Sequence, residues 1–329
     1  MKLYRVSDIQ VSEVLEKMYD LALFASGYEE RCTHIARRLA KERIANTIVL
    51  GFKEINHNEQ RFKNDLYFAE FWSNKQVELS TNDDGAIYTS IQQVARHSVD
   101  KLHILVDYSS MSRLWYAGVL NWARFALGIK EIIIDFVYAV GDHSHFGSPM
   151  VITDFLCIPG CEGGAVPIYK SVAVFGLGFE GLAALCVLDR LEPDEVYVYL
   201  ANPAAYAEYT QKTESQNIEL INQARAKLEL PLTSVENTFR HLAELISPHR
   251  SKADITFIPM GPKPHVLAAI LLSLRFEEVA CLRVSGKRDK PEDVGTTGEI
   301  VATRVHFKIR QPKQISIINK ANIQPAHKT

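Results

Sequence analysis

Short apolar runs alternate with longer segments of mixed polarity along most of the 329-residue chain. The runs are continuous rather than alternating in polarity, which is typical of strands in a parallel sheet that is covered on both faces. The segments between them carry the amphipathic spacing of helices. This order of strand and helix predicts an α/β fold in which helices cover mostly parallel sheets.

The sequence also contains an internal repeat. Residues 21–29, LALFASGYE, correspond without a gap to residues 172–180, VAVFGLGFE. Four further pairs of segments follow in the same order and at nearly constant spacing: 47–52 with 196–202, 103–120 with 255–272, 131–141 with 279–286, and 149–158 with 298–309. Five ordered matches of this kind indicate an internal duplication.

The duplication predicts two tandem Rossmann-like units, each a mostly parallel sheet that ends in a hairpin. We expect the first unit in residues 1–160 and the second in residues 168–310. The segment 158–170 is rich in Gly and Pro and is the expected boundary. Residues 311–329 are polar, which predicts a loose tail.

Composition places the chain among soluble globular proteins, with 47% hydrophobic and 23% charged residues. The formal net charge of −2 gives no overall basic field, so nucleic-acid binding rests on whether a local basic patch exists. No secretory signal opens the sequence, and no apolar run is long enough to cross a bilayer. We therefore expect a cytoplasmic protein with no membrane partner.

The five cysteines are odd in number and lie mostly in apolar or helical contexts. This usage is typical of reduced thiols in a cytoplasmic protein. Cys157 and Cys161 bracket a turn, but no second pair completes a zinc site, so no metal is expected.

Gly176, Gly178 and Gly181 have the spacing of a dinucleotide-binding turn between a strand and a helix. Such a turn is normally completed by an acidic residue at the end of the second strand, where this half carries Asn202. The first half keeps only the middle glycine, Gly27. The pattern therefore argues against a nicotinamide or flavin cofactor, and we expect no cofactor. The glycines are better explained by a turn that passes close to a ligand or to the other half.

In open α/β sheets, ligands bind at the carboxyl ends of the strands. The most polar of these ends is the turn at 106–113, VDYSSMSR. Asp107 closes the strand, hydroxyl groups follow at Ser109 and Ser110, and Arg113 is a fixed cation at the start of a helix. A helix start with hydroxyl groups and an arginine favours an anion. The alternative is that Ser109 or Ser110 merely caps the helix and that Asp107 completes the cap.

The equivalent turn of the second half is PMGPKPH, residues 259–265. Gly261 permits a close backbone approach. Lys263 is unfavourable beside the positive end of the helix dipole, and a bound anion would offset that cost. A solvated lysine is the alternative.

The turn at 26–32, SGYEERC, opens an expected helix and contributes four candidate ligand-binding residues: Ser26, Gly27, Glu29 and Arg31. The helix dipole alone favours acids at such a position, which is the simplest explanation for Glu30. Gly178 and Glu180 repeat Gly27 and Glu29 in the second half. A repeated acid at a strand end is suited to accept hydrogen bonds from ribose hydroxyls or an adenine amino group.

The turns VDYSSMSRLWYAGVL and IPMGPKPHVLAAILL resemble the fourth-strand turns of CARF domains and of the related SAVED domains. In those families a strand ends in a polar residue, a turn of small residues carries Ser or Thr and Lys or Arg, and a helix rich in small apolar residues follows. SAVED domains are similar to two fused CARF-like units, which agrees with the duplication. Neither turn here carries the double glycine that is usual in the family.

The resemblance implies a sensor of cyclic oligonucleotides in prokaryotic antiviral defence, with the nucleotide bound in a cleft between two Rossmann-like halves. Carried over by residue, Ser109, Ser110 and Arg113 match one anion-binding turn, while Gly261 and Lys263 match the other. Such sensors usually carry an effector domain, for which this chain leaves little room. The resemblance therefore also implies a separate effector protein as partner.

Two other functions stay open. Glu29, Glu30 and Asp107 gather acidic groups at the strand ends of the first half only, since Gly181 and Pro259 replace two of them in the second. That asymmetry is typical of one active and one structural half, and it favours an enzyme that hydrolyses a phosphodiester or glycosidic bond of a nucleotide or nucleic acid. The chain is alternatively a scaffold or adaptor in a multi-protein complex, in which case the polar turns are caps.

Overall fold

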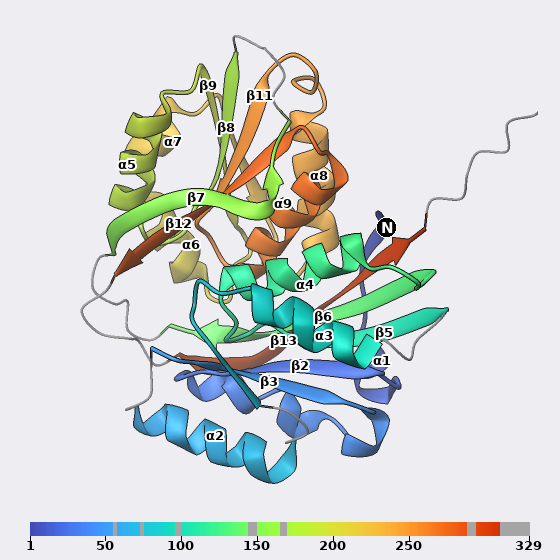
Figure 1. Ribbon diagram of the computed structural model, residues 1–329. Helices are drawn as coiled ribbons and strands as arrows, with labels where there is room; N and C mark the ends of the chain where they lie inside the picture. Colours follow the sequence, from blue (N-terminus) through green and yellow to red (C-terminus); the bar gives the residue numbers. More distant parts are fainter. Residues whose placement is uncertain are drawn as a thin grey trace, which may run out of the picture.

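The computed structural model describes residues 1–54, 58–72, 76–95, 100–143, 150–164, 170–287 and 294–309. It contains two mostly parallel sheets with helices packed against them (Figure 1), so the predicted α/β fold with two Rossmann-like units is confirmed. The polar tail expected at 311–329 lies outside the described residues. Among the described helices, none has the length and apolar character needed to cross a membrane.

The first sheet has seven strands within the described ranges, in the order β1 (Lys2–Asp8), β13 (Gly295–Lys308), β6 (Glu131–Asp142), β5 (Lys101–Asp107), β2 (Leu21–Ser26), β3 (Thr47–Phe52) and β4 (Gln76–Leu79). The five strands from β6 to β4 run parallel. Every residue of β2 and β3 is buried, as continuous apolar runs require. The helices of this part are α1 (Val11–Glu16), α2 (Glu59–Phe71), α3 (Gly85–Ala95) and α4 (Arg113–Phe125).

The second sheet has six strands among the residues described, in the order β10 (Ala226–Leu230), β9 (Glu195–Ala201), β8 (Ser171–Gly176), β11 (Asp254–Pro259), β12 (Val279–Lys287) and β7 (Val151–Glu162). Its helices are α5 (Gly181–Leu191), α6 (Ala207–Gln216), α7 (Ile218–Gln223), α8 (Val235–Ile246) and α9 (Lys263–Arg275). The five strands from β10 to β12 are parallel and repeat the order of β4 to β6. This common order agrees with the internal repeat.

The closing hairpin predicted for each half is wrong. β7 follows β6 in the chain but pairs antiparallel with β12, and β13 follows β12 but pairs antiparallel with β6. Each half therefore supplies the last strand of the other half's sheet, and the sheets do not separate at the predicted boundary near residue 160. An apolar strand pattern predicts that a segment forms a strand but not which sheet the strand joins.

A buried ion pair joins one exchanged strand to its host sheet. Asp135 on β6 is fully buried, and Arg304 on β13 donates to its two carboxylate oxygens at 2.7 and 2.9 Å. Tyr19 and Lys17 donate to the same carboxylate at 2.9 and 3.3 Å. Burial alone would raise the pKa of Asp135, but the hydrogen bonds from Arg304 and Tyr19 and the charges of Lys17 and Arg304 together outweigh it and hold the pKa below its ordinary value.

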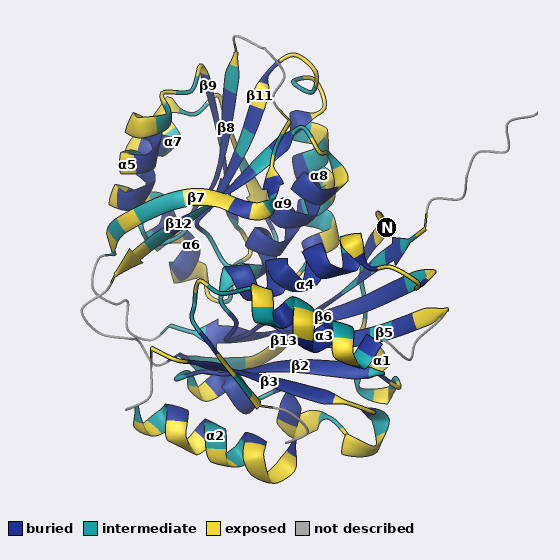
Figure 2. Ribbon diagram, viewed as in Figure 1, coloured by how far each residue is buried: buried dark blue, intermediate teal, exposed yellow. Residues whose placement is uncertain are grey.

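Helices α4 and α9 lie between the two sheets (Figure 1), and both are buried along most of their length (Figure 2). All residues of α9 from Pro264 to Leu274 are buried, as expected of a helix that is apolar all round. Trp115 of α4, Leu267 of α9 and Tyr199 of β9 belong to one continuous hydrophobic core. The two halves thus share a core, and the first turns of α4 and α9 follow directly on the carboxyl ends of their sheets.

Candidate functional site

Two of the predicted turns meet at the carboxyl end of the first sheet. β2 lies between β5 and β3, so the turns after β2 and β5 flank the point where the strand order reverses, which is the usual ligand site in such sheets. Gly27, after β2, packs against Ser110, after β5: a Cβ atom on Gly27 would lie 3.2 Å from the Cβ of Ser110. Such a contact is tight, so the lack of a side chain on Gly27 favours this close approach, which is to a turn of the same half and not to the other half.

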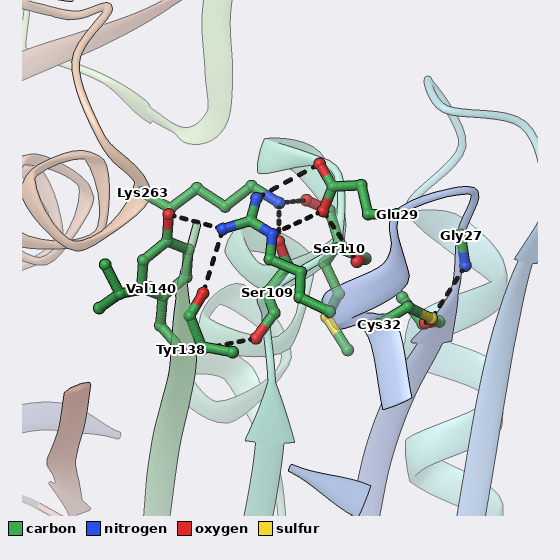
Figure 3. A network of polar contacts seen from close by, with 12 residues as sticks. Gly27, Glu29, Cys32, Ser109, Ser110, Tyr138, Val140 and Lys263 are labelled. Atoms are coloured by element: carbon green, nitrogen blue, oxygen red, sulfur yellow. Dashed lines mark hydrogen bonds and ion pairs between the residues drawn. The ribbon is translucent and has the colours of Figure 1, made fainter. Parts of the chain in front are cut away.

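The turn after β2 presents a fixed carboxylate. Arg31 donates from Nε to one oxygen of Glu29 at 2.9 Å, and Ser110 donates from Oγ to the same oxygen at 3.0 Å (Figure 3). Burial alone would raise the pKa of Glu29, but the charges of Arg31 and Lys263 and the hydrogen bonds from Arg31 and Ser110 together outweigh it and keep the pKa below its ordinary value. Glu29 is therefore an ionised acceptor whose position is set by its neighbours.

Arg31 is part of the internal structure of the site. Its side chain is 3% exposed, and its Nη1 donates to Tyr138 Oη at 2.9 Å and to the Ala139 carbonyl at 3.1 Å. These contacts tie the turn to β6, so Arg31 orients Glu29. Residues 30–43 form three short 3₁₀ turns at Glu30–Thr33, Ala36–Arg38 and Lys41–Arg43 instead of the expected helix. The buried Arg31 guanidinium fixes the first of these turns against β6.

Asp107 is the most unusual group of the site, because one of its carboxylate oxygens has no partner. The residue is 2% exposed, and Oδ1 accepts from the Ser109 backbone N–H at 3.0 Å and from its Oγ at 2.6 Å. Oδ2 is buried and has no hydrogen bond among the described residues. Burial raises the pKa of Asp107 to about 6, although the Ser109 bonds and the cations Lys263 and Arg31 oppose the rise.

Lys263 reaches this turn from the second half of the chain. Its ammonium group donates to the carbonyl oxygens of Tyr108, Ser109 and Met111 at 3.3, 2.5 and 2.9 Å (Figure 3). These three bonds use the three donors of an ammonium group. They offset the unfavourable position of Lys263 at a helix start, which the sequence attributed to an anion. Burial lowers the pKa of Lys263, and the Glu29 carboxylate opposes that change.

Arg113 is a half-buried cation at the first position of α4. The helix cap is Ser112, whose Oγ accepts from the Trp115 N–H at 3.3 Å, so Ser109 and Ser110 are not the caps that the alternative interpretation required. Within the described part of the chain, Arg113 makes no hydrogen bond or ion pair. It lies close enough to Lys263 to lower the pKa of that lysine. Of the predicted cations, Arg113 is thus the one available to an anion.

The equivalent turns of the second half pack against each other. A Cβ atom on Gly178 would lie 2.5 Å from the Met260 carbonyl oxygen, and one on Gly261 would lie 2.6 Å from that of Leu177. The lack of a side chain at these two glycines therefore allows the two turns to pack backbone against backbone. Glu180 accepts from the Met150 N–H at 3.1 Å. Pro259 and Gly261 stand in the second half where the first half has Asp107 and Ser109, so the polar side chains of these turns come mainly from the first half.

Two predicted residues lie at the margin of the site. Ser26 donates from Oγ to Asp65 on α2 at 2.6 Å, and Asp65 in turn accepts from Arg61 at 2.8 Å. Glu30 is exposed and lies beside Gly295 of β13, with Oε2 3.7 Å from where a Cβ atom would be. Of the three residues predicted for catalysis, Glu29 and Asp107 therefore lie within the site, and Glu30 points to its exposed edge.

Sequence reasoning missed a pair of asparagines. Asn64 of α2 donates to the carbonyl oxygens of Gly27 and Glu29 at 2.8 and 3.0 Å. Asn217 donates to the Gly178 carbonyl at 2.7 Å, and thus repeats the first of these contacts. Each asparagine follows its glycine at nearly the same spacing, so extending the repeat alignment past the apolar strands would have revealed the pair.

The arrangement combines hydrogen-bond acceptors with an available cation. Glu29 and Asp107 can accept from hydroxyl or amino groups, and Arg113 can bind an anion. Within the described ranges, no three His, Cys, Asp or Glu residues lie together in a metal-binding group. No protein-family model matches the chain, and no curated protein matches it. The resemblance to CARF and SAVED domains therefore stays a prediction.

Proposed function

We propose that the chain binds a nucleotide at the carboxyl end of the first sheet, as a sensor or as a subunit that reports a nucleotide signal to a separate effector protein. The observation that carries the proposal is the buried Asp107, whose Oδ2 has no partner among the described residues, in the same turn as the unpaired Arg113. Lys263 ties this turn to the second half, so a molecule bound here contacts a junction of the two halves.

A nucleotide supplies the groups that these residues lack. Its phosphate is a partner for Arg113, whose guanidinium can bind two oxygens at once. Its ribose hydroxyls or base amino groups are donors for Asp107 and Glu29. The resemblance of the strand-end turns to CARF and SAVED domains favours a cyclic oligonucleotide over a mononucleotide.

Isothermal titration calorimetry with cyclic di- to hexanucleotides tests the proposal. We expect at least one of them to bind the wild type, with affinity that falls as the salt concentration rises. Arg113→Lys should weaken binding because it loses the two-pronged contact, and Arg113→Ala should weaken it further. Arg240→Ala is the matched control, since it removes the same charge from an exposed position on α8. Folded wild type that binds no member of the panel would reject the proposal.

One observation favours an enzyme as a second candidate. A carboxyl group with a pKa of about 6, as burial gives Asp107, is suited to donate or accept a proton near neutral pH. The second half has Pro259 at the equivalent position, so only one half carries this group. Chromatography of candidate nucleotides after incubation with the protein tests hydrolysis. Turnover that persists unchanged in Asp107→Asn and Glu29→Gln would contradict this assignment.

A further inference from the structure

We infer that Arg283 of β12 joins Arg113 of α4 as a ligand for the phosphate of the bound nucleotide, so that each half of the chain supplies one guanidinium group. This inference rests on the proposed function and adds a residue that the sequence did not point to. It replaces Lys263, whose three donors bind carbonyl oxygens, as the contribution of the second half.

Contacts of the loop after β4 bring the two arginines to one place. Ser112, the cap of α4, donates from Oγ to the Thr81 carbonyl at 3.2 Å, which holds this loop against the start of the helix. Arg283 donates from Nη1 to Asn82 Oδ1 at 2.8 Å, one residue farther along the same loop. Arg283 therefore reaches across from the second sheet to the first turn of α4, where Arg113 lies.

The charge at this place is incompletely compensated. The Arg283 side chain is 12% exposed, and its ion pair within the described residues is a long one, at 3.8 Å from Asp154. Arg113 has no ion pair among the described residues. Burial lowers the pKa of Arg283, and the proximity of Arg113 adds to the lowering while Asp154 opposes it. Two neighbouring guanidinium groups repel one another in a partly buried setting.

Arg113 also lies near the second half, because its charge opposes the rise that burial gives to the pKa of Tyr199 in β9 and Cys281 in β12. A phosphate between Arg113 and Arg283 would accept hydrogen bonds from both and turn their repulsion into shared attraction. A nucleoside without phosphate cannot do this. The inference therefore specifies a ligand whose phosphate lies between the halves, with the base and sugar toward Asp107 and Glu29.

Calorimetry with the same panel of cyclic nucleotides tests the inference. We expect Arg283→Ala to weaken binding about tenfold or more, as loss of a charge-assisted hydrogen bond does, and Arg283→Gln to behave similarly while keeping much of the side-chain volume. Arg225→Ala removes the same charge from an exposed position in the second half and should leave binding unchanged. Nucleotide binding that is lost in Arg113→Ala but unchanged in both Arg283 variants would overturn the inference and leave the proposed function standing.

If no cyclic nucleotide binds the wild type, pyrophosphate tests the phosphate site of Arg113 and Arg283 separately from the nucleotide-binding proposal. We expect pyrophosphate to raise the melting temperature of the wild type and of Arg225→Ala, and to have little effect on Arg113→Ala and Arg283→Gln. That result would support the shared phosphate site even though the nucleotide proposal had failed. No shift with the wild type, or the same shift in all four proteins, would overturn the inference.

Discussion

Asp107→Asn should make the protein more stable near neutral pH. The ordinary pKa of an aspartate is 3.8, and burial raises the pKa of Asp107 to about 6. Because one pKa unit corresponds to about 1.4 kcal/mol, ionised Asp107 costs the folded state about 3 kcal/mol relative to the neutral acid. Because the folded state binds the Asp107 proton more tightly than the unfolded state, protonated Asp107 stabilises the wild type. This contribution is fully present below pH 3.8 and is lost as the pH rises through about 6.

The amide keeps the oxygen that accepts from Ser109, but its nitrogen occupies the position of the unpartnered Oδ2. A buried donor without a partner costs about 1–3 kcal/mol, so the net gain in stability at pH 7.5 is at most about 2 kcal/mol. The pH dependence of the stability difference between Asp107→Asn and the wild type is a clearer test than its absolute size, because the cost of the buried amide donor does not change with pH. A functional residue retained at the expense of stability is a common feature of binding and catalytic sites.

Urea unfolding of the wild type and Asp107→Asn between pH 4 and 8 measures this effect. The free energy of unfolding of the variant, relative to that of the wild type, should rise by about 2.5 kcal/mol between pH 4 and pH 8. Asp189→Asn, an exposed substitution on α5, is the control and should show no comparable trend. A difference between wild type and Asp107→Asn that does not change with pH would refute the reasoning.

Three further substitutions test the fold and the junction. Asp135→Asn should lower the free energy of unfolding by about 1–3 kcal/mol in urea titrations, because it removes the buried carboxylate charge that pairs with Arg304 and Lys17; since the folded pKa of Asp135 is lowered, the wild type should itself lose this stabilisation as the pH falls below about 4. Gly178→Ala should lower the melting temperature by several degrees, because its Cβ atom would lie 2.5 Å from the Met260 carbonyl oxygen and force the backbone apart. Lys263→Met should cost about 1–3 kcal/mol in urea titrations, since it leaves carbonyl groups in the turn after β5 without donors; unchanged stability in any of the three would contradict the role assigned to that residue.

The repeat in the sequence predicted most of the fold. The match of 21–29 with 172–180 and its four companions predicted two units of the same kind, and both sheets have the same order of parallel strands. The exchange of β7 and β13 was not predictable from the strand patterns. It depends on contacts between the two halves, which the strand pattern within one half does not contain.

The site was predictable in composition but not in its internal contacts. Strand ends and the polarity of 106–113 were sufficient to select Asp107, Ser109 and Ser110, which lie together as expected. The role of Lys263 depends on a contact between the halves, which no pattern within one half reveals. Arg283 lies in a strand whose apolar pattern predicts only burial. Its contact with Asn82, near the start of α4, could be found only from the structure.

Native mass spectrometry of the wild type mixed with each cyclic di- to hexanucleotide counts the nucleotides bound per chain. A single asymmetric site at the junction predicts one bound molecule per chain for at least one member of the panel, and its loss in Arg113→Ala. Two bound molecules per chain would contradict the single site, and no bound molecule across the whole panel, with the protein folded, would contradict the nucleotide assignment.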